Sequence, residues 1–237
     1  MRLDKVLGHV GYGSRKEVQK LIKAKKVTVD GKCIAKSEAN VNPETQVICV
    51  SGKPIDYKAY YYYLLNKPAG YVSATEDPRD ETVIDLLMQM DRNKELFPVG
   101  RLDKDTEGLL VLTNNGKLAH DLLSPKKHVD KIYYAKVKGE MVPEDTQVFA
   151  QGMTLKDGTT YRPGKLEIIS SGEFSEIYVT ISEGKFHQVK KMVQFVGKEV
   201  VYLQRIQMGQ LKLPKDLALG EYRQLTEDEL VELQSQV

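Results

Sequence analysis

Two short amphipathic helices are predicted at the start of the chain. Apolar residues recur at positions 3, 6, 7 and 10, the spacing of one helix face, and Gly11-Tyr12-Gly13 then ends the first helix. Ser14 with Glu17 three residues later is typical of a helix N-terminus, and positions 18, 21 and 22 form the next apolar stripe. The lysines of this second helix fall outside the stripe, so we expect one buried face beside a positively charged one.

Beyond residue 26 the apolar period changes from helical to alternating. Val27 and Val29 alternate with polar residues, Asp30-Gly31 is typical of a hairpin turn, and residues 47–50 form another short strand. We expect Ser51-Gly52-Lys53-Pro54 to be the linker that follows this small module, and the predicted domain boundaries are 1–55 and 60–237.

The second domain mixes strand and helix patterns without a strict βαβ repeat. Strands are predicted at 60–65, 109–113, 131–138, 165–170 and 176–182. Helices are predicted at 82–90, 116–123, 186–196 and 226–235. This order predicts an α+β fold, in which a small helix-rich module precedes a domain with a mixed, mainly antiparallel sheet flanked by helices.

Positive charge is concentrated at the N-terminus. The whole chain of 237 residues is 41% hydrophobic, which excludes a disordered protein, and its formal charge is only +2. Residues 1–36, however, hold ten basic and three acidic side chains, a net charge of +7, whereas the other 201 residues carry −5. This asymmetry indicates a polyanionic partner for the N-terminal module.

Clustered basic residues with a helix N-terminus suit the binding of phosphate groups. A solvated helix face would show a similar pattern, but the net charge favours phosphate binding. A DNA-reading helix would be expected to expose Asn, Gln or Arg for base edges, whereas lysine dominates here and favours backbone contacts. The candidate RNA-binding residues of this module are Arg2, Ser14, Arg15, Lys16, Lys20 and Lys23.

Several other function classes find no support. Cys33 and Cys49 are too few and too isolated for a disulfide framework or a zinc cluster. Residues 1–5 lack the apolar core of a signal peptide, and nowhere do 18 uncharged apolar residues follow one another. We therefore expect a cytoplasmic protein with no membrane partner.

The segment 100–114 is the most informative part of the second domain. It places Asp103 in a loop bounded by glycines just before an apolar strand, which could aim the carboxylate into a cleft. A calcium loop is a poor match, because its twelfth position is Asn114 instead of glutamate. A charged surface turn is an alternative. In the catalytic interpretation Asp103 is a nucleophile or base, since aspartate is ionised at neutral pH without assistance.

Two further segments could contribute to the same cleft. Phe186, Val189, Met192, Val193 and Val196 are expected to face inward from a helix that ends at Gly197. Lys190 lies beside this stripe, where it could pair with a carboxylate or simply extend to solvent. Alternation along 131–137 points Tyr133 inward, either as a plain core residue or as a surface for a flat base. His187 is given no acid–base role.

Together these motifs closely resemble the RsuA-like family of pseudouridine synthases, from the first residues to about residue 213. The N-terminal segments Arg2-Leu3-Asp4-Lys5, Ser14-Arg15-Lys16 and 27–31 resemble the small RNA-binding domain named after ribosomal protein S4. The motifs of the second domain are Asn66-Lys67-Pro68-Ala69-Gly70, Gly100-Arg101-Leu102-Asp103, Lys131-x-Tyr133, and residues 184–192 followed by Val200-x-x-Leu203-x-Arg205.

The resemblance implies site-specific isomerisation of a uridine in rRNA to pseudouridine, with no cofactor and no metal. Asp103 matches the catalytic aspartate, Tyr133 the base-stacking tyrosine and Lys190 the basic residue that pairs with the aspartate. Arg101 matches the arginine that holds the place of the flipped nucleotide, and Lys67 is expected to contact RNA.

The target and partners follow from the same resemblance. Lysines at 190 and 191, where the family commonly has arginines, favour the branch that acts on small-subunit (16S) rRNA. Large-subunit rRNA, or a ribosome assembly factor that binds RNA without catalysis, stays open as an alternative. A hydrolase that uses Asp103 as its base lacks a convincing His or metal partner. We expect a monomer that binds rRNA or a ribosomal subunit assembly intermediate, and no DNA.

Overall fold

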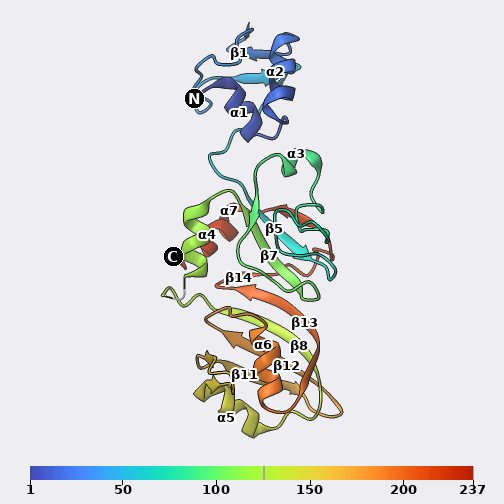
Figure 1. Ribbon diagram of the computed structural model, residues 1–237. Helices are drawn as coiled ribbons and strands as arrows, with labels where there is room; N and C mark the ends of the chain where they lie inside the picture. Colours follow the sequence, from blue (N-terminus) through green and yellow to red (C-terminus); the bar gives the residue numbers. More distant parts are fainter. Residues whose placement is uncertain (125, 237) are drawn as a thin grey trace.

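The computed structural model describes residues 1–124 and 126–236 and arranges them as three parts stacked in a line (Figure 1). The N-terminal domain forms one end. A middle part surrounds strands β5 and β7, and a far part surrounds β8, β12 and helix α6. The middle and far parts share one continuous sheet.

The N-terminal domain contains the two predicted helices. Helix α1 spans Leu3–His9 and α2 spans Arg15–Lys23, with Ser14 and Glu17 forming the predicted capping box. An antiparallel sheet of order β2-β1-β3-β4 packs against their apolar stripes. Its strands are β1 Val27–Val29, β2 Lys32–Cys33, β3 Ile48–Val50 and β4 Lys53–Pro54.

The expected linker at 51–54 is wrong. Ser51 and Gly52 have positive φ angles of 51° and 80° and turn the chain back, so that Lys53–Pro54 pairs with β3. Ser-Gly pairs serve hairpin turns as readily as linkers, because glycine adopts positive φ at little cost. The connection to the next strand is instead residues 55–61.

The rest of the chain is built on one sheet of order β11-β12-β8-β13-β7-β5-β15. Its strands are β5 Tyr62–Lys67, β7 Glu107–Thr113, β8 Lys131–Lys138, β11 Lys165–Ser170, β12 Phe174–Ile181, β13 Glu199–Met208 and β15 Tyr222–Gln224. Two short strands also join it: β6 Phe97–Pro98 pairs with β7, and β14 Leu211–Lys212 pairs with β13. Strands β9 Met153–Thr154 and β10 Thr160–Tyr161 form a separate hairpin. Strands β7 and β13 run parallel, and the other pairings in this order are antiparallel. The predicted α+β fold with a mixed, mainly antiparallel sheet is confirmed.

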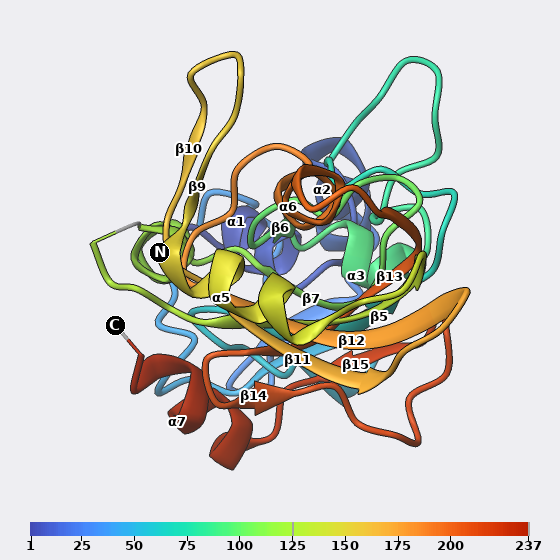
Figure 2. The same ribbon diagram turned by 90° about the horizontal axis from the view of Figure 1, so that it is seen from below.

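Helices cover both faces of this sheet. On one face, α5 (Pro143–Gln151) and α6 (Gln188–Phe195) pack into the larger core, and on the other α4 (Gly116–Leu123) and α7 (Glu227–Gln234) pack into a second core. Figure 2 shows α6 and α7 on opposite sides of the sheet. Within residues 1–124 and 126–236, no helix combines the length and apolar content that crossing a membrane requires.

The predicted helix at 82–90 is also wrong. The Val83 amide donates to the Val72 carbonyl at 3.0 Å, which ties this segment to residue 72, and a helix, α3, forms only at Gln89–Arg92. Val83 and Leu87 are both buried, and this produced the helical spacing in the sequence. Buried apolar residues four positions apart therefore arise here from turns packed on the core.

The parallel contact between β7 and β13 depends on a glycine. Gly108 has a φ angle of 101°, and a Cβ atom there would lie 2.3 Å from the Arg205 carbonyl oxygen. A side chain would therefore force the strands apart. This contact fixes the start of β7, where the preceding loop 100–106 ends, against β13.

Candidate active site

A buried lysine holds the Asp103 loop in place. Lys67, at the end of β5, donates from Nζ to the carbonyl oxygens of Asp103 (3.1 Å), Lys104 (3.2 Å) and Thr106 (2.8 Å), and to its neighbour Pro68 (3.0 Å). Burial lowers the pKa of Lys67 to about 8. The expectation that Lys67 contacts RNA is wrong, because its side chain is fully buried and its ammonium faces the inside of this loop.

A second anchor holds the loop from its other side. The Ser73 hydroxyl donates to the Leu102 carbonyl at 2.9 Å and accepts from the Leu102 amide at 3.0 Å. Ser73 itself is buried. Asp103 therefore extends from a loop whose backbone is bonded on both sides of it, as a fixed functional group requires.

The Asp103 carboxylate lies beside Lys190 of α6. The Lys190 Nζ is 3.1 Å from Asp103 Oδ2, and both side chains are 24% exposed. Lys190 also donates to both carboxylate oxygens of Asp105, at 2.6 and 2.9 Å. Burial alone would lower the pKa of Lys190, but the hydrogen bonds to Asp105 and Asp103 raise it above its ordinary value. The sequence interpretation assigned no role to Asp105, which shares this lysine.

His187 lies on the other side of the aspartate. Its Nε2 is 3.5 Å from Asp103 Oδ1, and its φ of 52° places it just before α6 in a left-handed conformation. Phe186 stacks on the His187 ring at a centroid distance of 3.7 Å. The expectation that Phe186 faces inward is wrong: it is 71% exposed, because the helix begins after His187 and the helical spacing does not apply to it.

Tyr133 completes a small cavity with Asp103. It is buried on β8, as the alternation predicts, and faces this cavity together with Ile181 and Leu203. Arg101 lines the same cavity from the exposed side. The structure thus brings Asp103, Tyr133, Lys190 and Arg101 together from three separate segments of the chain.

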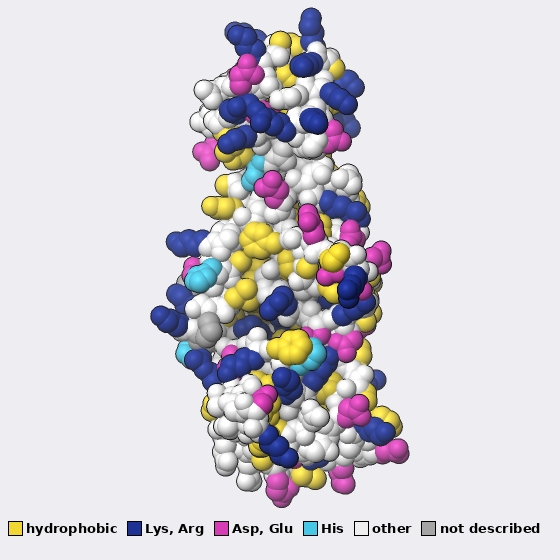
Figure 3. Space-filling model, in the orientation of Figure 1, with side chains coloured by type: hydrophobic (Ala, Val, Ile, Leu, Met, Phe, Trp, Pro, Cys, Tyr) yellow, Lys and Arg dark blue, Asp and Glu magenta, His cyan; other side chains and the backbone are white. Residues whose placement is uncertain are grey.

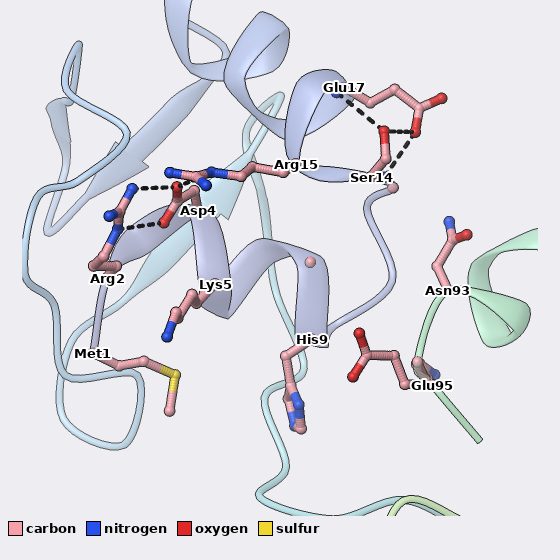
Figure 4. Close-up of a pocket in the computed structure, with 13 residues that line it drawn as sticks. Met1, Arg2, Asp4, Lys5, His9, Ser14, Arg15, Glu17, Asn93 and Glu95 are labelled. Atoms are coloured by element: carbon pink, nitrogen blue, oxygen red, sulfur yellow. Dashed lines mark hydrogen bonds and ion pairs between the residues drawn. The ribbon is translucent and has the colours of Figure 1, made fainter. Parts of the chain in front are cut away.

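The basic residues of the N-terminal domain lie well away from this cavity, at the end of the molecule (Figure 3). Figure 4 shows that Arg2 bonds Asp4 through both Nε (3.0 Å) and Nη2 (2.7 Å), and Arg15 lies 3.6 Å from the same carboxylate. The Ser14 hydroxyl bonds Glu17 in the capping box. These residues border a groove of about 670 Å³, to which Lys5, part of the quoted motif but not among the candidate RNA-binding residues, also contributes. The expected lysines Lys16, Lys20 and Lys23 are exposed along α2.

The arrangement can be compared with known families. The family model described as RNA pseudouridylate synthase matches residues 61–195, and the model of the S4 domain matches residues 1–47. The chain belongs to the RNA pseudouridylate synthase family. The synthase is an isomerase of the RsuA-like group with an N-terminal S4 domain, as the motifs predict, and it converts uridine to pseudouridine in RNA.

Relatives match the synthase over nearly its whole length. It is 51% identical over 231 residues to the uncharacterized RNA pseudouridine synthase YtzG of Bacillus subtilis (strain 168), with 97% of each chain covered. It is 38% identical to ribosomal small subunit pseudouridine synthase A of Escherichia coli (strain K12), over 97% of this chain and 98% of that one. It is 37% identical to ribosomal large subunit pseudouridine synthase B of Bacillus subtilis, over 99% and 96%. A crystal structure of a pseudouridylate synthase superposes with a TM-score of 0.69 at 31% identity, covering 98% and 99%.

Proposed function

We propose that the synthase isomerises a specific uridine of small-subunit (16S) rRNA, with Asp103 as the nucleophile. The observation that carries this proposal is the position of Asp103 beside Lys190, at 3.1 Å, in a cavity that also holds Tyr133. The substrate is either free rRNA or a ribosomal subunit assembly intermediate. Cofactors take no part in the proposed reaction.

The reaction breaks the bond between N1 and C1′, turns the uracil and joins C5 to C1′. N1 gains a proton and C5 loses one to water, so that neither an oxidant nor an energy source is needed. The Asp103 carboxylate acts on the sugar, either by direct attack at C1′ or by promoting elimination. Lys190 compensates the charge of this carboxylate when bound RNA excludes water from the cavity.

The uridine must leave its stack before Asp103 can reach its sugar, which costs a few kcal/mol. Tyr133 is proposed to pack against the flipped base, since it lines the cavity beside Asp103. Arg101, exposed at the cavity rim, is proposed to hold the place that the base vacates. Phosphate contacts elsewhere offset the cost of flipping.

Residues 1–55 are proposed to form a separate RNA-binding domain that supplies these phosphate contacts. Residues 60–237 are proposed to form the catalytic domain. Lys16, Lys20 and Lys23 lie exposed on α2 and can meet a phosphate backbone. Arg2 and Arg15 are oriented by Asp4, and Ser14 lies at the N-terminus of α2.

The lysines at 190 and 191 favour small-subunit rRNA over large-subunit rRNA as the substrate. The relatives include one enzyme named for the small subunit and one named for the large subunit. The test is to incubate the synthase separately with 16S and 23S rRNA, each tritiated at uridine C5, and to measure tritium release to water. Free rRNA and isolated assembly intermediates are compared in parallel. Release from 16S alone supports the proposal, and release from 23S alone overturns it. Tight binding without release from either would instead indicate a non-catalytic assembly factor.

A further inference from the structure

A second cavity, of about 400 Å³, lies next to the Asp103 cavity, and of the residues that line it only Arg101 has a role in the reaction proposed above. It is lined by Arg101, Lys131, Glu183 and Lys185, together with Pro98 and Leu123. Arg101 and Lys185 line the Asp103 cavity as well. The two cavities are therefore neighbours, and a ligand could extend from one into the other.

Lys131 is a buried cation in the wall of this cavity. It is 5% exposed, and its Nζ donates to the Val129 carbonyl oxygen at 2.7 Å. That carbonyl is its only hydrogen-bond acceptor among the residues that the structure describes. An ammonium group carries three donors, and buried lysines are normally paired with an anion. Two N–H donors of Lys131 thus lack an acceptor beside an open cavity.

A second buried cation adds to the positive charge behind this wall. Arg205 of β13 is 2% exposed, and its Nε donates to the Leu109 carbonyl oxygen at 2.8 Å. Its Nη2 has no acceptor within the described part of the chain. Burial, followed by the charge of Arg205, lowers the pKa of Lys131 to about 8, whereas exposed Asp130 opposes the shift.

The one carboxylate in the cavity wall is engaged elsewhere. Glu183 accepts from the Gln188 side chain at 2.8 Å and from the backbone amide of residue 162 at 2.9 Å, and Lys185 lies 3.7 Å away. Lys185 also donates to the Thr160 carbonyl. With Arg101, Lys131 and Lys185 against this single carboxylate, the cavity carries a net positive charge.

We propose that this cavity binds a phosphodiester group of the RNA next to the target uridine, with Lys131 as its buried cationic ligand. The proposal rests on the proposed function, in which Tyr133 packs against the flipped base. Lys131 and Tyr133 lie on the same face of β8, two residues and about 7 Å apart, so a phosphate of the same chain can reach Lys131. Its oxygens supply the acceptors that the ammonium lacks.

The first test measures rRNA affinity over a range of salt concentrations for wild type and Lys131→Met. Loss of one phosphate contact is expected to reduce the slope of log Kd against log salt by about 0.7. Lys136→Met is the matched control, because this lysine lies on the same strand but is exposed on its other face, and its slope should equal that of wild type. Equal slopes for Lys131→Met and wild type, or equal reductions in both variants, overturn the proposal.

The second test removes the charge from the RNA, so its first readout, the affinity of the wild type, needs no folded variant. Once the position of the target uridine has been mapped, a synthetic RNA that spans it is prepared. In this RNA the phosphate on each side of the uridine is replaced in turn by a neutral methylphosphonate. At one of the two positions the methylphosphonate should weaken binding by the wild type. The same replacement should not weaken binding by Lys131→Met any further, because that variant already lacks the contact. No loss at either position, or equal losses in both proteins, overturns the proposal. The salt slopes are obtained from binding measurements alone. They therefore test the phosphate contact of Lys131 even if the wild type releases no tritium and the proposed function fails.

Discussion

Replacing Lys67 by methionine tests whether this lysine holds the Asp103 loop. The carbonyl oxygens of Asp103 and Lys104 keep a second donor, from the amides of Thr106 and Gly70, whereas those of Pro68 and Thr106 lose their one donor among the described residues. Each buried carbonyl left without a donor costs about 1–3 kcal/mol, and relief from burying a charge offsets part of the sum. We expect Lys67→Met to lower the free energy of unfolding by about 2–4 kcal/mol.

The assay is urea unfolding at pH 7, with the free energy taken from the midpoint and slope. Lys104→Met is the control, because Lys104 lies in the same loop but forms an exposed ion pair with Asp80 at 2.6 Å, worth about 0–1 kcal/mol. A loss of stability in Lys67→Met no larger than that in Lys104→Met would refute the role of Lys67.

Lys190 and Asp91 are each partly buried and each bonded to charged partners. Lys190→Met should reduce turnover on the order of 100-fold while rRNA affinity changes little, because Lys190 compensates the Asp103 charge at the reacting sugar; equal losses in the tritium-release and filter-binding assays would contradict this. Burial alone would raise the pKa of Asp91, but hydrogen bonds from Lys94, Tyr63 and Tyr222 hold it below its ordinary value. Its contribution to stability is therefore present above the unfolded pKa of about 3.9 and is lost as the pH falls through the lower folded pKa. Asp91→Asn should be less stable than wild type at pH 7, and the difference should shrink below about pH 4; a constant difference in urea midpoints would rule this out.

Features encoded by residues close in the sequence could be predicted from it. The two N-terminal helices depend on spacing within each helix and on the local Ser14–Glu17 capping box, and both are present in the structure. The alternation of β8 placed Tyr133 in the core. The helix predicted at 186–196 forms, although it begins two residues later, at Gln188.

Features that depend on distant partners could not be predicted. Lys67 bonds carbonyls 36 to 39 residues away, so its burial has no local signal, and the family resemblance led us to expect an RNA contact instead. The sequence did not predict strand β13. In this strand the apolar Val201 is 50% exposed and the charged Arg205 is buried, whereas apolar side chains are usually buried and charged ones exposed. The position of Asp105 beside Lys190 depends on two segments 85 residues apart.

A comparison of Asp103→Asn with Asp105→Asn shows whether the Asp103 carboxylate acts on the sugar of the target uridine. Both variants remove one carboxylate from the same loop and from the same lysine. We expect Asp103→Asn to bind rRNA about as well as wild type but to release no tritium above background, and we expect Asp105→Asn still to release tritium. Release by Asp103→Asn at a rate comparable to that of wild type would contradict this role of Asp103.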